Sequence, residues 1–293
     1  MWLCALRNTP TGGGIASADI FDLLPIAVHQ LGENFDILGK VLHVIESYLL
    51  LDINRVLQVL RLSSHRCLFT DSHRWKSHGL ELHKAFNQVF EGTSGVNVKH
   101  LLETVNLMTQ LASLSTGNAS ALCAEAMHVS GFFGKILTGV IDGNKNMTLA
   151  LVEVNQVFAR IILASPAIFM QLVSAASPVV GQTEEWLLTG FLDQWWNLVR
   201  GLNESPQPYY GQSDRRRRLQ FDNIAEPGRR KLVALATANL LTTGHRVVIE
   251  RLVSCEQFNI WIDVLGELKE ALATDPDDST LYVPHLRTPI SLI

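Results

Sequence analysis

Histidine and cysteine side chains gather in one short stretch of the chain. The group comprises His65, Cys67, His73, His78 and His83. Imidazole nitrogens and thiolate sulfurs are the usual ligands of Zn²⁺, which holds four of them in a tetrahedron. The spacings match no zinc-finger pattern and no HExxH motif, and zinc ligands usually come in close pairs. The pattern therefore favours a solvated loop, and no metal ligand is assigned.

Four consecutive arginines, Arg215 to Arg218, form the second chemically distinctive stretch. Short arginine runs can contact nucleic-acid phosphates or act as nuclear-localisation signals. The net charge of -4 and the lack of aromatic residues among the arginines argue against a nucleic-acid partner. Adjacent like charges repel one another and gain from full solvation. We therefore expect an exposed loop whose arginines bind nothing specific.

Patterns of common catalytic sites are missing from the sequence. The stretch TGGGIAS at 11–17 lacks the lysine and the preceding strand of a phosphate-binding loop, and no GxSxG elbow occurs. The candidate carboxylates have the spacing of a solvated helix face: Asp222, Glu226, Asp263 and Glu267. Trp195 and Trp196 could form a binding platform, but such a pair on a helix more often lies in the core. The sequence thus predicts a protein that is not an enzyme, with no cofactor and no catalytic, cofactor-binding or metal-binding residue.

The elements that must position these residues are helices, because apolar residues recur along the chain at helical spacing. One stripe contains Leu101, Val105, Met108 and Ala112. Another contains Met147, Ala150, Leu151, Val154, Phe158 and Ile161. A third contains Phe258, Trp261, Val264, Leu265, Leu268 and Leu272. The third stripe predicts that Trp261, Leu265 and Leu268 are buried between the last helices.

Strand signals are almost absent, and short breaks such as EGTSG, STGN and TTGH separate the predicted helices. Such breaks suit antiparallel helix hairpins stacked side by side. At about 40 to 47 residues per HEAT-type unit, the chain holds roughly six hairpins. We therefore predict an all-α fold, a HEAT-type solenoid; a compact all-α bundle is the alternative.

Composition agrees with a large buried core, since 47% of the 293 residues are hydrophobic and 18% are charged. The four cysteines lie far apart and favour free thiols over disulfides. Residues 161–180 carry no charge and have the length of a membrane span. Pro166, Pro178 and Gln171 disfavour insertion into a membrane, so we predict a buried helix pair there.

Three segments carry a family resemblance: FLDQWW at 191–196, FDNIAEPGRRKLVALATANLLTTG at 221–244, and FNIWIDVLGELKEA at 258–271. Together they resemble the C-terminal HEAT repeats of the importin-β (karyopherin-β) family, in particular importin-11-like nuclear import receptors. AEAMHVSGFFGKIL and ARIILASPAIFMQLVSA, earlier in the chain, are similar to late repeats of the same proteins. The similarity extends over most of the chain.

The resemblance also implies a domain organisation. A HEAT-repeat solenoid is expected at 1–275, with loops at 61–79 and 197–220 and an irregular tail at 276–293. The family pattern runs almost directly across both loops, so they are interpreted as translated intron sequence or as lineage-specific insertions. The chain is expected to be a C-terminal fragment that begins downstream of the family's N-terminal repeats.

The function implied by the resemblance is that of a non-enzymatic nuclear transport receptor for protein import. Its expected partners are cargo proteins, the Phe-Gly repeats of nucleoporins and the GTPase Ran, the last through N-terminal repeats. Neither nucleic acid nor membrane insertion is expected, and the receptor would shuttle between nucleus and cytoplasm at the nuclear envelope. A helical-repeat scaffold that holds a static protein complex is the alternative. No protein-binding residue is assigned.

Overall fold

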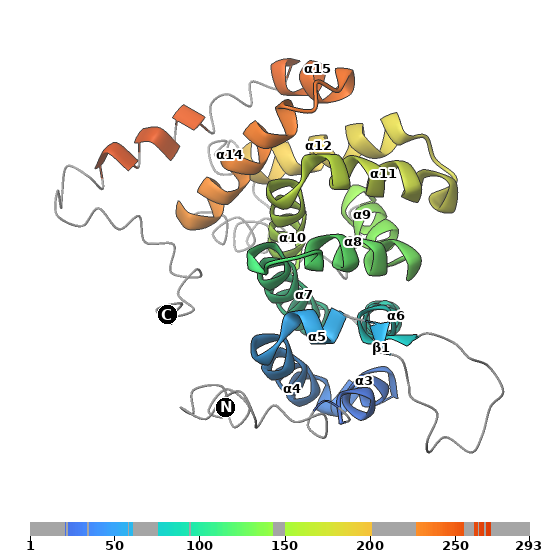
Figure 1. Cartoon of the computed structure of the whole chain (residues 1–293). Coiled ribbons are helices and arrows are strands. Elements are labelled where there is room, and N and C mark those ends of the chain that lie inside the picture. The colour runs from blue at the N-terminus through green and yellow to red at the C-terminus, as the bar shows by residue number, and fades with distance from the viewer. Residues whose placement is uncertain are drawn as a thin grey trace, which may run out of the picture. The chain divides into compact units, whose positions relative to one another are not determined.

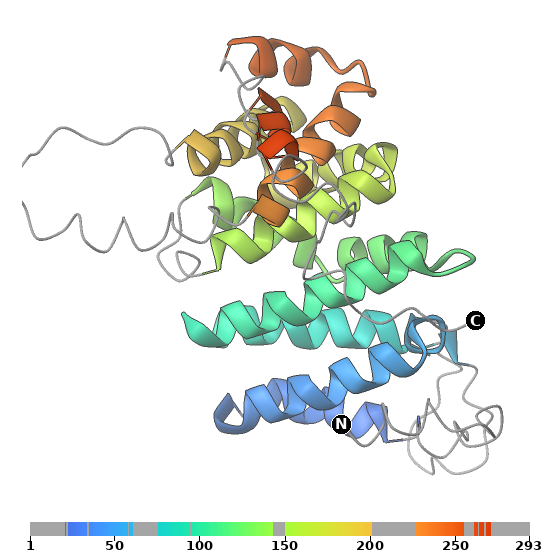
Figure 2. The same ribbon diagram turned by 90° about the vertical axis from the view of Figure 1, so that its left-hand side faces the viewer.

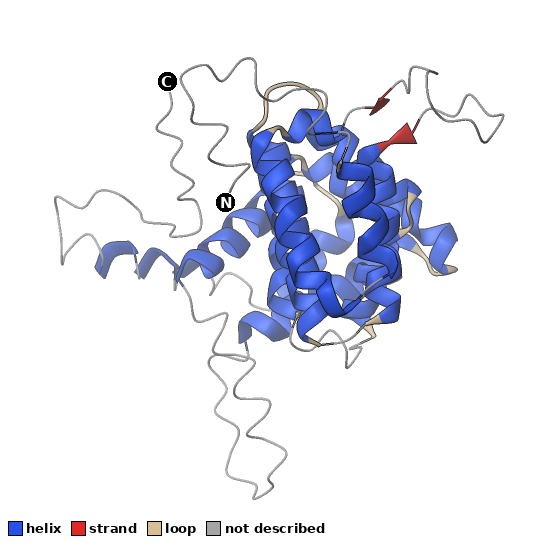
Figure 3. Cartoon of the chain, turned by 90° about the horizontal axis from the view of Figure 1, so that it is seen from below, coloured by secondary structure: helices blue, strands red, loops and turns tan. Residues whose placement is uncertain are grey.

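Antiparallel helix pairs follow one another along the chain in the computed structural model (Figure 1). The structure describes residues 21, 23–33, 35–57, 59–60, 76–93, 95–142, 150–200, 227–254, 261–262, 264–266 and 268–270. Figure 3 shows that this part of the chain is helical apart from turns and one short strand pair. The predicted all-α fold is confirmed.

Contacts divide the chain between Glu184 and Glu185 into two compact units, whereas the sequence predicted one array at 1–275. The helices of the first unit are α3 (Leu24–Glu33), η1 (Phe35–Ile37), α4 (Leu38–Leu51), α5 (Ile53–Leu57), α6 (His78–Gly92), α7 (Val96–Leu114), α8 (Ala119–Val129), α9 (Phe132–Ile141), α10 (Leu151–Ala164) and α11 (Pro166–Val180). Those beyond are α12 (Glu184–Arg200), α14 (Pro227–Leu241) and α15 (Arg246–Ser254). The strands β1 (Val59–Leu60) and β2 (Lys76–Ser77) pair antiparallel, with Val59 opposite Ser77.

Within the first unit the helices form two layers (Figures 1 and 2). Helices α4, α7 and α10 pack side by side in one layer, and α3, α6, α8, α9 and α11 form the other. Successive hairpins contribute one helix to each layer: α3 with α4, and α6 with α7. Helices α8 and α9 both belong to the second of these layers, where each packs against α11. This stacking of helix pairs is what a helical-repeat sequence requires to bury its apolar stripes.

The predicted stripes form the core between the layers. Leu101, Val105 and Met108 of α7 are fully buried, as are Val154 and Phe158 of α10. These residues lie three or four positions apart, so each set covers one side of its helix. Both stripes are confirmed for the residues that the structure describes, except that Leu151 at the start of α10 is only partly buried.

Three phenylalanines fasten α9, α10 and α11 together. The ring of Phe133 lies 5.6 Å from that of Phe158 and 6.0 Å from that of Phe169. The rings meet edge to face, the arrangement that aromatic quadrupoles favour. The hydrophobic segment 161–180 thus ends α10 and forms α11 within a packed core.

Ser165 separates these two helices. Its backbone is extended, its side chain accepts a hydrogen bond from the amide of Ile168 at 3.2 Å, and Pro166 is the first residue of α11. A proline suits this position, because its missing N–H would have no partner in the first turn. The predicted helix pair is present, but α11 is buried on one face only, since Phe169 and Val173 are buried whereas Val179 is 72% exposed. Among the residues that the structure describes, no helix is long and apolar enough to cross a membrane.

Both predicted loops are shorter than expected at one end. The segment 61–79 was predicted as loop, but α6 already begins at His78. The segment 197–220 was likewise predicted as loop, yet α12 continues to Arg200. The first four residues of the predicted loop, 197–200, therefore continue the helix. The helix ends just before Gly201, a residue of low helix propensity. Lys76 and Ser77 of the first predicted loop form β2, and residues 61–75, 201–220 and 276–293 lie outside the described residues.

The predicted burial of the last stripe is wrong for Leu265, which is 62% exposed. Trp261 is partly buried, and its indole Nε1 donates a hydrogen bond to the carbonyl of Ala234 on α14 at 2.8 Å. Leu268 is also partly buried. The covered part of this stripe is therefore narrower than predicted and does not include Leu265. Phe258 and Leu272 lie outside the described residues.

Candidate protein-binding face

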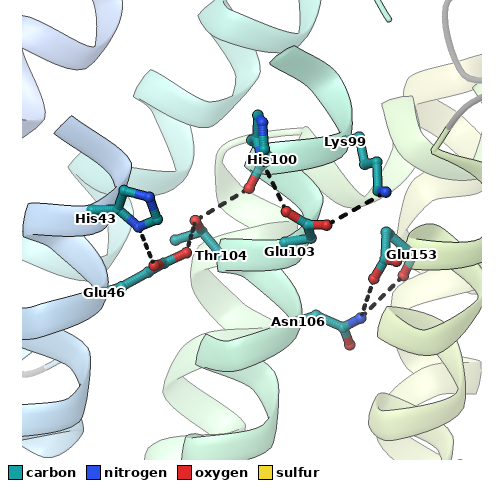
Figure 4. A network of polar contacts seen from close by, with 8 residues as sticks. All are labelled: His43, Glu46, Lys99, His100, Glu103, Thr104, Asn106 and Glu153. Atoms are coloured by element: carbon teal, nitrogen blue, oxygen red, sulfur yellow. Dashed lines mark hydrogen bonds and ion pairs between the residues drawn. The ribbon is translucent and has the colours of Figure 1, made fainter. Parts of the chain in front are cut away.

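A network of polar contacts runs across the layer formed by α4, α7 and α10 (Figure 4). We call this surface and its network the α4–α7–α10 face. Its members are His43 and Glu46 of α4, Lys99, His100, Glu103, Thr104 and Asn106 of α7, and Glu153, Gln156 and Arg160 of α10. Each member lies on a helix of this layer, so the stacking of hairpins brings together residues far apart in sequence.

The link between α4 and α7 is a buried hydroxyl. Thr104 is fully buried, and its Oγ1 donates to Oε1 of Glu46 at 2.8 Å. The same hydroxyl lies 3.2 Å from the carbonyl oxygen of His100. A hydrogen bond from a neutral donor to a carboxylate is among the stronger ones, so this contact fixes the two helices against each other.

The exposed part of the face repeats one side-chain pair on two neighbouring helices. His43 Nδ1 lies 3.0 Å from Oε2 of Glu46, and His100 Nδ1 lies 3.0 Å from Oε2 of Glu103. Residues three apart share one side of a helix, which allows both contacts. The His43 side chain is 82% exposed and that of His100 51%. The contacts of these two exposed imidazoles contribute little to stability, and both rings are accessible to a binding partner.

The link between α7 and α10 is made by Asn106, which is almost fully buried. Its Nδ2 donates to Oε1 of Gln156 at 3.1 Å and to Oε2 of Glu153 at 3.3 Å. Its Oδ1 accepts a hydrogen bond from Nε of Arg160 at 3.0 Å. Burial lowers the pKa of Arg160, and the carboxylate of Glu153 opposes this shift. One amide therefore holds a buried carboxylate and a partly buried guanidinium in place.

His83 is the one member of the predicted histidine and cysteine cluster whose side chain the structure describes. It does not lie in a solvated loop: it is fully buried in α6, with its ring against those of Phe86 and Phe132. Its Nδ1 lies 2.7 Å from the carbonyl oxygen of Gly79. Burial lowers the pKa of His83 to about 4. The apolar spacing of α6 places it in the core, so the solvated-loop prediction is wrong for this residue.

The other chemically distinctive residues fall into two groups. Trp195 is buried, as predicted for a core residue. The side chain of Trp196 and residues Cys67, Arg215 to Arg218, Asp222 and Glu226 lie outside the described part. So do Asp263, Glu267, His65, His73 and the side chain of His78. In the described ranges, no three histidine, cysteine or acidic side chains come together in a way that could hold a metal ion.

No residue of the α4–α7–α10 face was predicted from the sequence as a binding residue. Thr104 and Asn106 flank Val105, a residue of the predicted α7 stripe, so polar residues bordering the stripe were the available signal. Their partners Glu46 and Glu153 lie about fifty residues away in sequence, and spacing within one helix cannot reveal them.

Comparison with protein families matches the chain to the family described as importin-11-like, TPR repeats, over residues 1–207 and 219–289. The match omits 208–218, which lies within the predicted loop at 197–220, and it extends across 61–79. Searches among curated proteins and among solved structures gave no match.

Proposed function

We propose that this chain, which belongs to the importin-11-like family of helical-repeat proteins, serves in a nuclear transport receptor that imports proteins. The observation that supports this most directly is the α4–α7–α10 face, which lies on a stack of helix pairs of the type shared by this family. Extended surfaces of such stacks commonly bind other proteins.

The proposed cargo site is the exposed part of the α4–α7–α10 face. His43 and His100 present imidazole rings there and Lys99 an ammonium group, while Glu46 and Glu103 present carboxylate oxygens. Mixed charges at a solvated surface favour selective and reversible association over very tight binding. The buried contacts of Thr104 and Asn106 keep the helices at fixed spacing, so the exposed groups form a surface of constant geometry.

The remaining steps of transport are proposed from family membership. The receptor would take cargo in the cytoplasm, pass the nuclear pore by weak contacts with Phe-Gly repeats of nucleoporins, and release cargo when GTP-bound Ran binds. It would thus shuttle between cytoplasm and nucleus across the nuclear envelope. No step requires bond-making by the chain, so the proposed role is non-enzymatic.

Binding to immobilised Phe-Gly repeats tests this function. The purified chain is passed over a Phe-Gly repeat peptide and over a matched peptide in which every Phe is replaced by Ser. A transport receptor is expected to be retained by the first and to elute freely from the second. Equal elution from both would contradict the proposal and would favour a helical-repeat scaffold that holds a static complex.

A further inference from the structure

A small cavity lies where α7, α8, α10 and α11 meet in the first unit. Its volume is about 20 Å³, room for a group the size of a water molecule or a methyl group. Its walls are mainly apolar and include Ala112, Cys123, Met127 and Ile161. Ala164 also lines the cavity and is exposed, so the cavity reaches the protein surface.

The polar groups of the cavity wall differ in what they bind. The hydroxyl of Thr109 donates to the carbonyl of Val105 at 2.8 Å, and that of Ser120 donates to the carbonyl of Ala112 at 3.1 Å. Both hydroxyls therefore already donate within the protein. Arg160 is the charged residue of the wall. Within the described part of the chain, its guanidinium makes one hydrogen bond, from Nε to Asn106.

The terminal nitrogens of Arg160 have no hydrogen-bond partner among the described residues. Asn106 holds Nε at 3.0 Å, which orients the guanidinium plane. The guanidinium is partly buried, which lowers the pKa of Arg160, while the nearby carboxylate of Glu153 raises it. A partly desolvated guanidinium with free donors is stabilised by an anion that pairs with it.

We propose that an aspartate side chain of an acidic peptide segment binds at the surface opening of this pocket, with its carboxylate on the terminal nitrogens of Arg160. The planar fork of a guanidinium matches the two oxygens of a carboxylate. The cavity accepts a methyl group, so a neighbouring alanine of the same segment fits, whereas a leucine does not. The inference rests on the proposed function only in taking the partner to be a protein.

The test uses a fluorescein-labelled peptide of alternating Ala and Asp with both termini blocked, so that aspartate supplies the only carboxylates of the peptide itself, and the matched peptides carry the same dye. Two matched peptides replace Asp by Asn or Ala by Leu. Fluorescence anisotropy with the purified chain at low salt is expected to show about tenfold weaker binding for each matched peptide. Equal binding of the Asp and Asn peptides, equal binding of the Ala and Leu peptides, or no binding of the Ala-Asp peptide would overturn the proposal.

Two variants test whether the Ala-Asp peptide binds at the pocket. Arg160→Gln removes the charge and is expected to reduce binding of the Ala-Asp peptide to the level of the Asn peptide. Lys84→Gln removes one exposed positive charge on α6, outside the pocket wall, and is expected to leave binding unchanged. An equal loss in both variants would indicate unspecific attraction and overturn the proposal.

Circular dichroism checks that Arg160→Gln is folded. If it is not folded, two other variants test the pocket instead. Arg160→Lys keeps the positive charge but loses the planar guanidinium, and Ala164→Leu fills the exposed rim of the cavity. Unchanged affinity in both would exclude the pocket. Binding of the Ala-Asp peptide without retention on Phe-Gly repeats would leave this site standing and remove the transport role; the converse would remove only this site.

Discussion

His83 is a buried imidazole that stays neutral at physiological pH, and this gives the fold a defined pH dependence. Burial lowers its pKa from the ordinary 6.5 to about 4, so the unfolded chain binds the proton more readily. The contribution of His83 to stability is complete above pH 6.5 and is lost as the pH falls toward 4. The difference corresponds to about 3 kcal/mol. We expect chemical unfolding to show this loss between pH 6.5 and 4. His83→Leu is the control: an unchanged pH dependence in this variant would assign the loss to other groups.

Asn106 joins the α7 and α10 parts of the α4–α7–α10 face, and its removal is expected to be costly. Asn106→Leu leaves the buried Glu153 carboxylate and Arg160 Nε without this amide. Loss of a hydrogen-bond partner by a buried polar group costs about 1–3 kcal/mol. Urea unfolding measures the effect, with the exposed His43→Ala as the matched control that should change little. A loss below 0.5 kcal/mol, about the usual effect of a surface change, would show that the network does not hold the helices together.

Asn155, also on α10, shows the opposite situation. It is buried, and neither its Oδ1 nor its Nδ2 has a hydrogen-bond partner in the described part of the chain. Replacing an unsatisfied buried amide by an apolar side chain of similar size removes a desolvation penalty. Asn155→Leu is therefore expected to raise the free energy of unfolding by about 1 kcal/mol in the same assay. A clear destabilisation would mean that the amide has a role the described contacts do not contain.

At the scale of elements, two glycines at α9 have opposite roles. A Cβ on Gly134 would lie 3.6 Å from Val180 and 3.7 Å from Ala176, an ordinary contact with α11. Gly134→Ala should therefore stabilise the helix by about 0.5–1 kcal/mol. Gly131, the residue before α9, has φ of +75°, so Gly131→Ala should destabilise. Thermal unfolding of both variants checks the contrast, and a destabilising Gly134→Ala would show that α9 and α11 pack too closely for a methyl group.

The helices of the first unit were largely predictable from the sequence, because an apolar stripe such as that of α7 lies within one helix. The α7 stripe through Leu101 and Met108 follows from local spacing alone. The exposure of Leu265 could not be predicted in this way, because it depends on which neighbouring helix covers the stripe. The α4–α7–α10 face escaped prediction for the same reason: Glu46 and Thr104 meet only after two hairpins stack.

At the scale of the whole molecule, the central claim is that this importin-11-like chain serves in nuclear import. The most direct measurement follows the chain, fused to a large inert protein that cannot diffuse through the nuclear pore, in permeabilised cells. The fusion is expected to gather at the nuclear envelope and to accumulate inside the nucleus, while the inert protein alone stays outside. A fusion that remains excluded like the inert protein, although the chain is folded by circular dichroism, would contradict it.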